Sequence, residues 1–355
     1  MTTVANFEIK YTQILNEKAE VCQALPEFAA DAEQLIELYK AMVLTRTFDK
    51  KAIALQRTGK LGTYPSSLGQ EAISVAVGTV MQADDVLVPY YREYGAQFIR
   101  GVTMKEILLY WGGDERGMDY QGPRKDFPIS VPIASQASHA IGLSYAMKLR
   151  NERRVAVAFF GDGSTSKGDF YEAVNAAGVW NLPVVFVVNN NQWAISIPRE
   201  NQTKCETIAQ KAFAGGIRGE QVDGNDIIAL HQVMESAIER ARKGEGPSVV
   251  EAITYRLCDH TTADDATRYR PEDEVNSAWD KEPVARLRSY MQSQKIWTDE
   301  QEQKLLAECT KKVEAQVNAY LDTQPQPPET MFDFMFENIP HDLAKQREYF
   351  MGRGK

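Results

Sequence analysis

Three nearly continuous apolar runs stand in the middle of the chain, and stretches with helical spacing separate them. The runs stand at residues 155–160, in "PVVFVVNNN" at 183–191 and in "PSVVEAITYR" at 247–256. None has the strict polar-apolar alternation of a strand with one face in water. Strands that are apolar on both faces belong to parallel sheets with helices on each side. The pattern therefore predicts an α/β fold whose parallel sheet is covered by helices on both faces.

Helical spacing is recognisable before and between these runs. Asp31 can cap a helix that continues to Arg57. In a second helix, Ile141, Tyr145 and Leu149 recur at spacing four, which predicts that they share one face. Further helices are expected at 169–180 and 227–242.

The chain is expected to divide into three parts. Residues 1–30 have little periodicity and are expected to form an N-terminal arm. Residues 31–275 contain the α/β domain, and within it the Tyr-, Gly- and Arg-rich stretch at 62–122 is expected to form loops around a site. Residues 276–355 are expected to form a helical C-terminal extension with a proline-rich linker at 323–329.

Composition and charge narrow the possible functions. The 355 residues are 43% hydrophobic, enough for a large core, and the formal net charge is -9. A clustered basic face, which nucleic-acid binding requires, is missing. No stretch approaches the ~20 apolar residues of a membrane-spanning helix, the start lacks a secretory-signal pattern, and the four cysteines lack metal-binding spacing. We therefore expect a cytoplasmic protein that contacts neither nucleic acid nor membrane.

The first apolar run ends at a carboxylate between two glycines, Gly161-Asp162-Gly163. Glycine turns after strands often bind phosphate, but the dinucleotide fingerprint fails because Ser166 stands at its third small position. The phosphate loop of nucleotide hydrolases also fails, since Asp169 stands where that loop has lysine. On the turn alone, a structural turn with a capping aspartate and a ligand site both stay open.

The next strand favours the ligand site. Asn191 ends the run that follows this strand, and a strand-helix-strand unit of this length has a right-handed crossover with parallel strands. Asp162 and Asn191 are therefore expected beyond the carboxyl ends of strands in one sheet, where ligands of open α/β sheets bind. Their oxygens suit Mg²⁺, which usually shares its ligands with phosphates. Gly161 and Gly163 would let a diphosphate approach the backbone.

The sequence G-D-G, followed one such unit later by N-N, resembles the signature of thiamine diphosphate enzymes. The likeness extends over residues 31–342, in which "RTGKLGTYPSSLGQEA", "PYYREYGAQFIRG", "NNNQWAISIP", "QVDGNDIIA" and "DHTTADDATRYR" stand in order. This order and spacing resemble the alpha subunits of heteromeric 2-oxo acid dehydrogenases, in their first, decarboxylating component. Residues 31–275 would then be the thiamine diphosphate-binding domain. The resemblance is nearest to the bacterial pyruvate dehydrogenase alpha subunits, and the branched-chain relatives are close behind.

The resemblance implies an enzyme that oxidatively decarboxylates pyruvate and reductively acetylates the lipoyl group of a transacylase. A branched-chain substrate, 2-oxoisovalerate, is the alternative. The implied cofactors are thiamine diphosphate and Mg²⁺. The implied partners are a beta subunit, with two alpha and two beta chains assembled, and the lipoyl-bearing dihydrolipoyl transacylase. The beta subunit would bring the glutamate that contacts the pyrimidine ring. A non-catalytic binding protein of the same fold and a Mg²⁺-nucleotide enzyme are the rival hypotheses.

The family's site residues fall on definite positions of this chain. The implied metal ligands are Asp162, Asn191 and the backbone carbonyl of Trp193. The residues implied to bind the cofactor are Tyr91, Arg92, Val131, Ile133, Asp162, Gly163, Ser164, Asn191, Arg256 and His260. A second, monovalent cation would bind Ser130, Ser135 and Gln136.

His260 is the implied catalytic residue, which would stabilise or protonate intermediates and the lipoyl sulfur. From its position alone, just past a strand, it could equally be a core or capping histidine. Asp259 precedes it, and a neighbouring carboxylate is expected to favour imidazolium. Thr63 stands where many members have Phe near the substrate pocket, which weakens the transfer of substrate preference.

Overall fold

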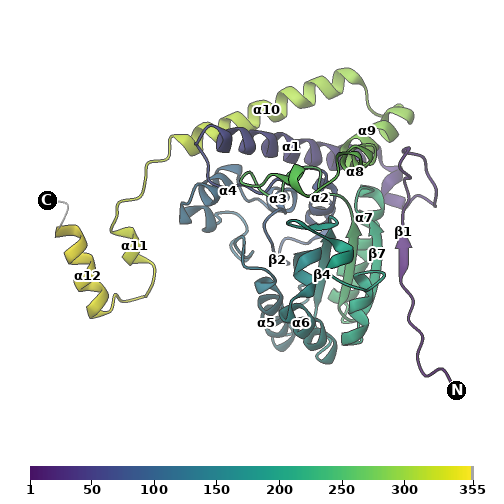
Figure 1. Ribbon diagram of the computed structural model, residues 1–355, viewed down its shortest axis with the longest axis horizontal. Coiled ribbons are helices and arrows are strands. Elements are labelled where there is room, and N and C mark those ends of the chain that lie inside the picture. Colours follow the sequence, from purple (N-terminus) through teal and green to yellow (C-terminus); the bar gives the residue numbers. More distant parts are fainter. Residues whose placement is uncertain (353–355) are drawn as a thin grey trace.

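A six-stranded sheet forms the centre of the computed structural model, which describes residues 1–352 (Figure 1). Neighbouring strands are parallel throughout, in the order β1-β7-β8-β4-β3-β2. The strands are β1 (Lys10–Thr12), β2 (Val86–Val88), β3 (Ala156–Gly161), β4 (Val184–Asn190), β7 (Arg218–Asp223) and β8 (Ser248–Ile253). A separate antiparallel pair consists of β5 (Trp193–Ala194) and β6 (Ile197–Pro198).

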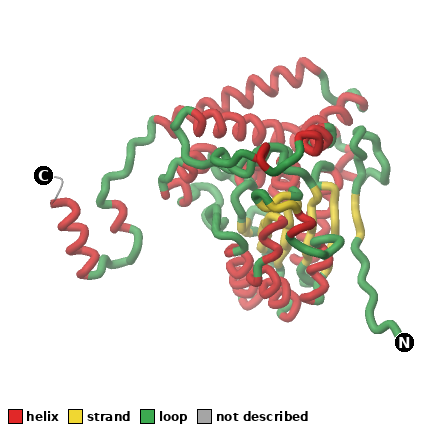
Figure 2. Tube along the Cα trace, viewed as in Figure 1, coloured by secondary structure: helices red, strands yellow, loops and turns green. Residues whose placement is uncertain are grey.

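Helices cover both faces of the sheet, which confirms the predicted fold class (Figure 2). They are α1 (Ala32–Arg57), α2 (Glu71–Val80), α3 (Tyr94–Ile99), α4 (Met104–Trp111), α5 (Ser135–Leu149), α6 (Gly168–Val179), α7 (Ile227–Arg242), α8 (Glu272–Trp279), α9 (Pro283–Ser293), α10 (Asp299–Leu321), α11 (Thr330–Asp333) and α12 (His341–Gly352). Alternate side chains of β3 enter two cores, because successive residues of a strand point to opposite faces. Val157 and Phe159 pack in the core of α1, α2 and α7, whereas Ala158 and Phe160 pack in that of α5 and α6.

The helical C-terminal extension lies across the first core. α10 lies beside α1 (Figure 1), and the Tyr39 hydroxyl of α1 donates a hydrogen bond to Glu302 of α10 at 2.8 Å. Leu287 and Val313 are buried in the same core as Tyr39. The last two helices extend away from the rest of the molecule and contact each other through Phe332 and Phe350. Residues 353–355 of the predicted extension lie outside the described residues.

The predicted helix after Asp31 is confirmed, and Asp31 accepts the backbone N–H of Glu33 at 2.9 Å. Residues 62–122, however, contain α2, β2, α3 and α4 rather than loops alone. Helix α2 is buried on nearly every side, so its Ala, Val and Ile residues produce no amphipathic pattern. The second predicted helix is confirmed as α5, in which Tyr145 and Leu149 are exposed whereas small residues such as Ala137 and Ala140 face the core.

The N-terminal segment, expected to be an arm, adds strand β1 to the edge of the sheet. Its position depends on Asp226, which is fully buried and caps α7. The carboxylate accepts the backbone N–H groups of Ile14 and Leu15 at 2.6 and 2.7 Å, and those of Ile228 and Ala229 in the helix. Strand β7, which it follows, was not predicted because its Arg218–Asp223 sequence is mostly polar.

Within residues 1–352, none of the helices combines the length and the apolar character that crossing a membrane requires.

Replacing Asp226 by Asn should destabilise the fold by about 2–4 kcal/mol, because an amide has one oxygen and leaves at least one buried N–H without an acceptor. Urea denaturation followed by tryptophan fluorescence would measure the loss. The matched control is Asp84→Asn, since that side chain is exposed and its replacement should change stability by less than about 0.5 kcal/mol. Equal effects of the two substitutions would contradict this account.

Candidate active site

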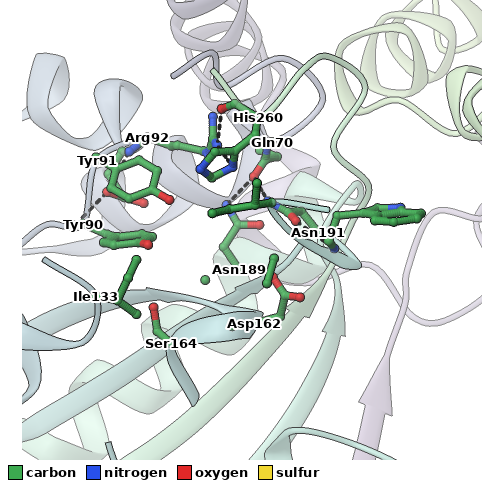
Figure 3. Close-up of a pocket in the computed structure, with 16 residues that line it drawn as sticks. Gln70, Tyr90, Tyr91, Arg92, Ile133, Asp162, Ser164, Asn189, Asn191 and His260 are labelled. Carbon is green, nitrogen blue, oxygen red and sulfur yellow. Dashed lines mark hydrogen bonds between the residues drawn. The ribbon is translucent and has the colours of Figure 1, made fainter. Parts of the chain in front are cut away.

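A cavity of about 180 Å³ opens at the carboxyl edge of the sheet, between the loops that follow β2, β3, β4 and β8 (Figure 3). Backbones of parallel strands end together at this edge, so loops distant in sequence meet there. The lining residues are Gln70, Tyr90, Tyr91, Arg92, Glu93, Ile133, Gly161, Asp162, Gly163, Ser164, Asn189, Asn191, Trp193, Ala194, Ile195 and His260.

Asp162 and Asn191 meet across one wall of this cavity. Gly161 pairs with Asn189 in the parallel ladder of β3 and β4, which brings the two loops side by side. Asp162 is 3% exposed, and burial raises the pKa of its carboxyl. One carboxylate oxygen accepts the Gln202 amide at 2.8 Å. No lysine or arginine in the described part of the chain forms an ion pair with it.

Gln70 orients both asparagines of this wall. Its side-chain oxygen accepts the amide groups of Asn189 and Asn191, each at 3.0 Å. Three polar atoms of lining residues are buried without a hydrogen-bond partner in the described residues: Gln70 Nε2, Asn189 Oδ1 and Ser164 Oγ. Buried polar atoms without partners are rare and costly, so this wall is suited to a polar ligand.

The opposite wall is cationic. Arg92 is 5% exposed, and its guanidinium donates to the carbonyls of Ser66 at 2.5 Å and His260 at 2.7 Å. Arg256 is fully buried and donates to the carbonyls of Trp193 and Ile195. Neither guanidinium forms an ion pair with a carboxylate among residues 1–352. Two buried cations without acidic partners favour an anion in the cavity.

His260 is neutral, contrary to the expectation from Asp259. Its Nδ1 lies 3.1 Å from Arg92 Nη2 and 3.4 Å from Arg256 Nη1, so it must accept rather than donate. Burial first, and then these two guanidiniums, lower the pKa of His260 to about 3. The Asp259 carboxylate instead accepts the backbone N–H of Ala266. The proton of the neutral ring is therefore on Nε2.

Two residues implied to bind the cofactor do not line the cavity. Val131 is 46% exposed, and Arg256 is fully buried outside the lining, where it donates to the carbonyl of Trp193. The other implied residues all line the cavity, and their roles stay predictions. In the predicted monovalent-cation site, the hydroxyls of Ser130 and Ser135 lie 2.6 Å apart, whereas Gln136 donates to the carbonyl of Phe159. That site also stays a prediction.

Six lining residues were missed from the sequence: Gln70, Tyr90, Glu93, Asn189, Ala194 and Ile195. Glu93 is 3% exposed and accepts the backbone N–H groups of Tyr90 and Arg92, which fixes the turn that presents Arg92. Burial raises the pKa of Glu93 to about 7. Its position inside "PYYREYG" could have revealed Glu93 as a site residue, because an acid among bulky aromatic side chains requires hydrogen-bond donors around it.

A metal held by a diphosphate fits this donor set. No three His, Cys, Asp or Glu side chains gather to hold a metal in the part of the chain that the structure describes. A hard cation here would therefore combine Asp162 with amide and carbonyl oxygens and with oxygens of its ligand, as Mg²⁺ commonly does. A side chain at Gly163 would collide with Ala194, since its Cβ would lie 2.6 Å from the Ala194 Cβ.

Fold and cavity together define an α/β protein with a polar, charged cavity at the carboxyl edge of its sheet, a donor set suited to an anionic, metal-chelated ligand. Residues 39–329 match the family described as "Dehydrogenase E1 component", and the chain belongs to this family as an alpha subunit of the 2-oxo acid dehydrogenase type. It is 41% identical over 317 residues to a Mycobacterium tuberculosis protein named "3-methyl-2-oxobutanoate dehydrogenase subunit alpha", covering 89% of this chain and 86% of that protein.

Relatives named for another substrate are almost as similar. A Bacillus cereus protein named "Pyruvate dehydrogenase E1 component subunit alpha" is 39% identical over 342 residues, covering 95% of this chain and 91% of that protein. The Staphylococcus aureus protein of the same name is 36% identical over 352 residues, with coverages of 98% and 94%. Because the two groups differ so little in identity, the comparison gives the family and leaves the acyl chain of the substrate open. The family implies thiamine diphosphate and Mg²⁺.

Replacing His260 by Asn should make folding stability less sensitive to acid. The unfolded chain binds a proton at this residue near pH 6.5, whereas the folded chain does so near pH 3. The contribution of His260 is therefore fully present above its unfolded pKa and is lost as the pH falls toward the folded value. Relative to the variant, the wild type should lose up to about 1.4 kcal/mol per pH unit below 6.5.

Urea denaturation of both proteins between about pH 8 and pH 5 measures this difference. The control is His341→Asn, because His341 is exposed on α12 and contacts neither guanidinium. A wild-type-minus-variant difference that is constant across this range would contradict the neutral assignment of His260.

Proposed function

We propose that this chain is the alpha subunit of a pyruvate dehydrogenase, which binds the diphosphate end of thiamine diphosphate with Mg²⁺ and acts with a beta subunit. The observation that carries the proposal is the charge arrangement of the cavity. An unpaired buried carboxylate, Asp162, stands on one wall, and Arg92 without an acidic partner stands on the other. A metal-diphosphate pair satisfies both, because its cation meets the carboxylate and its anion meets the guanidinium.

Asp162, Asn191 and the carbonyl of Trp193 would hold Mg²⁺. The backbone N–H groups of Gly163 and Ser164 and the Arg92 guanidinium would hold the diphosphate oxygens, as expected for a turn that follows a parallel strand. When bound, thiamine diphosphate supplies a nucleophilic carbon and an electron sink for decarboxylation. The binding role stated for Tyr91 follows from its place in the cavity lining beside Arg92.

The cofactor's rings would be shaped by residues at the mouth. Ile133 lines the cavity and is 41% exposed, in keeping with a side chain that a ring would cover. The carbonyl of Val131 would accept from the amino group of the pyrimidine. We assign no direct phosphate contact to Arg256, since its donors already serve backbone carbonyls and the Tyr269 hydroxyl at 2.8 Å.

His260 would act through Nε2. Its Nδ1 is fixed as an acceptor between two guanidiniums, so the neutral ring offers the Nε2 proton to a substrate oxygen or to the lipoyl sulfur. Hydrogen-bond donors that are already oriented stabilise developing negative charge without reorganisation. The positive neighbours also disfavour a doubly protonated ring, so donation of a hydrogen bond is the favoured role.

A beta subunit is needed because the lining offers no free carboxylate for the pyrimidine ring. Among residues 1–352, the acids in the lining are Asp162, proposed for the metal, and Glu93, which accepts two backbone N–H groups. Apolar side chains of the lining are about half exposed, including Ile195 at 54% and Ile133 at 41%. Exposed apolar groups around a site mark a surface that another chain covers. A lipoyl-bearing transacylase would then accept the acyl group.

Two other functions compete with this proposal. A branched-chain 2-oxo acid dehydrogenase alpha subunit is favoured by the relative at 41% identity, and it would use the same residues on a bulkier substrate. A non-catalytic binding protein would need to have lost site residues, yet Asp162, Asn191, Arg92 and His260 are all present around the cavity.

Asp162→Ala should abolish the metal-dependent binding of thiamine diphosphate, because it removes the charged ligand from an otherwise neutral donor set. Isothermal titration of the chain assembled with its beta subunit, with and without Mg²⁺, measures the effect. Asp169→Ala is the matched control, since Asp169 is exposed on α6 a few residues away. Binding by Asp162→Ala as tight as in the control would refute the metal assignment.

Decarboxylation should require the beta subunit. The chain purified alone, with its purity checked by mass, should show under about one-hundredth of the assembled rate at saturating cofactor and Mg²⁺, because loss of a proton-transfer group costs about 10²–10⁴. The assembled enzyme would then be given pyruvate, 2-oxobutyrate and 2-oxoisovalerate. We expect kcat/KM to be highest for pyruvate. If kcat/KM is highest for 2-oxoisovalerate, the proposed pyruvate dehydrogenase activity is wrong and the branched-chain activity takes its place. In the first of these two experiments, turnover by the isolated chain as fast as that of the assembled enzyme would show that the two-subunit proposal is mistaken.

A further inference from the structure

Asp49 is a buried carboxylate that the proposed function leaves unexplained. It lies on α1, is 1% exposed, and forms no ion pair within residues 1–352. Burial raises its pKa to about 6. A buried charge without a counterion is unfavourable unless hydrogen bonds compensate for lost water. An uncharged residue would avoid this cost, so the bonds that Asp49 accepts are where its role must lie.

All of those bonds come from one turn, residues 64–67. Asp49 accepts the Tyr64 hydroxyl at 2.9 Å, the Ser66 hydroxyl at 2.5 Å and the backbone N–H of Ser67 at 2.8 Å. Hydrogen bonds to an ionised acceptor are about twice as strong as neutral ones. The carboxylate therefore fixes both the backbone and the side chains of this turn.

The same turn holds the two loops that carry the cationic wall. The carbonyl of Ser66 accepts the Arg92 guanidinium at 2.5 Å. The backbone of Tyr64 exchanges two hydrogen bonds with Thr262, at 3.0 and 2.9 Å, and so holds the loop of His260. Arg92 in turn donates to the carbonyl of His260 at 2.7 Å and contacts its Nδ1. Arg92 and His260 are thus each one or two hydrogen bonds from the turn that Asp49 holds.

We propose that Asp49 is the positioning residue of this site, which fixes Arg92 and His260 in their working geometry through the turn at 64–67. This inference rests on the proposed function for its effect on turnover. Asp49 does not line the cavity and touches no reacting atom. Its effect is on alignment, and a displacement of about 1 Å in a catalytic group can reduce a rate about 100-fold.

The test compares Asp49 with Asp226, because both are buried carboxylates without an ion pair that accept several hydrogen bonds. Asp226 holds the N-terminal segment and α7 rather than the turn at 64–67. Asp49→Ala, Asp49→Asn and Asp226→Asn would each be assembled with the beta subunit. Turnover would be normalised to the folded, cofactor-loaded fraction near pH 7.5, above the pKa of about 6 for Asp49.

We expect kcat to fall about 100-fold in Asp49→Ala, about tenfold in Asp49→Asn, whose amide can still accept and donate in this turn, and less than twofold in Asp226→Asn. KM for the 2-oxo acid should change less than kcat. Hydrogen exchange by mass spectrometry gives a readout without turnover. Amides in 62–70 and 258–266 should exchange faster in both Asp49 variants, whereas in Asp226→Asn the faster exchange should lie in 10–16 and 226–230.

The outcomes separate this inference from the proposed function. A wild-type assembly without 2-oxo acid turnover would refute the proposed function, and the exchange data would still test Asp49. Wild-type kcat in the Asp49 variants, or an equal loss in Asp226→Asn, would overturn the positioning role. So would unchanged exchange at 258–266, because the proposal requires the loop of His260 to loosen. If Asp49→Ala fails to assemble, Asp49→Asn decides by the same two readouts.

Discussion

The parallel pairing of β3 with β4 is the constraint on which the site depends. In this register Gly161 lies opposite Asn189, so the chain leaves both strands at the same level of the sheet. Asp162 comes one residue after the first strand and Asn191 one residue after the second. A shift of one residue would turn one of these side chains to the other face of the sheet. Burial of the two strands on both faces fixes the register and, with it, the donor set.

Separated charges are the second feature of the site. Several buried charges elsewhere in the described residues are paired, as Arg242 is with Asp85 and Arg286 with Asp223. Around the cavity, Asp162 and the two guanidiniums of Arg92 and Arg256 lack such partners within the described residues. Buried charges of this kind are unfavourable in the absence of a ligand. They favour the binding of a ligand that places positive charge at the carboxylate and negative charge at the guanidiniums. Burial, together with the same guanidiniums, keeps His260 neutral, which neither its sequence neighbours nor its type would indicate.

The class of fold could be predicted because the central strands are apolar on both faces, and such continuous apolar runs are recognisable in the sequence alone. The sequence also predicted Asp162 and Asn191, since both follow directly from strand ends. Sequence reasoning failed for α2, whose burial on nearly every side removes the amphipathic signal. It also failed for β1 and β7, whose polar side chains hide their places next to each other at one edge of the sheet. It failed for Gln70 because that residue precedes a helix far from Asn191 in sequence and reaches it only in the folded chain. The neutral state of His260 was missed because its neighbours in space, two arginines, outweigh its neighbour in sequence.

The lengths of the strands have a consequence for the chain before it finds a partner. The strands are longest at the centre of the sheet and shortest at its edges, since β4 spans Val184–Asn190 whereas the edge strands β1 and β2 each have only 3 residues. The outer strand β1 is largely exposed and begins with Lys10. A short, exposed edge strand with a charged residue offers few free backbone groups to another sheet and so opposes aggregation by edge-to-edge pairing. A newly made subunit is thereby protected against self-association through the β1 edge of its sheet while it is still without a partner.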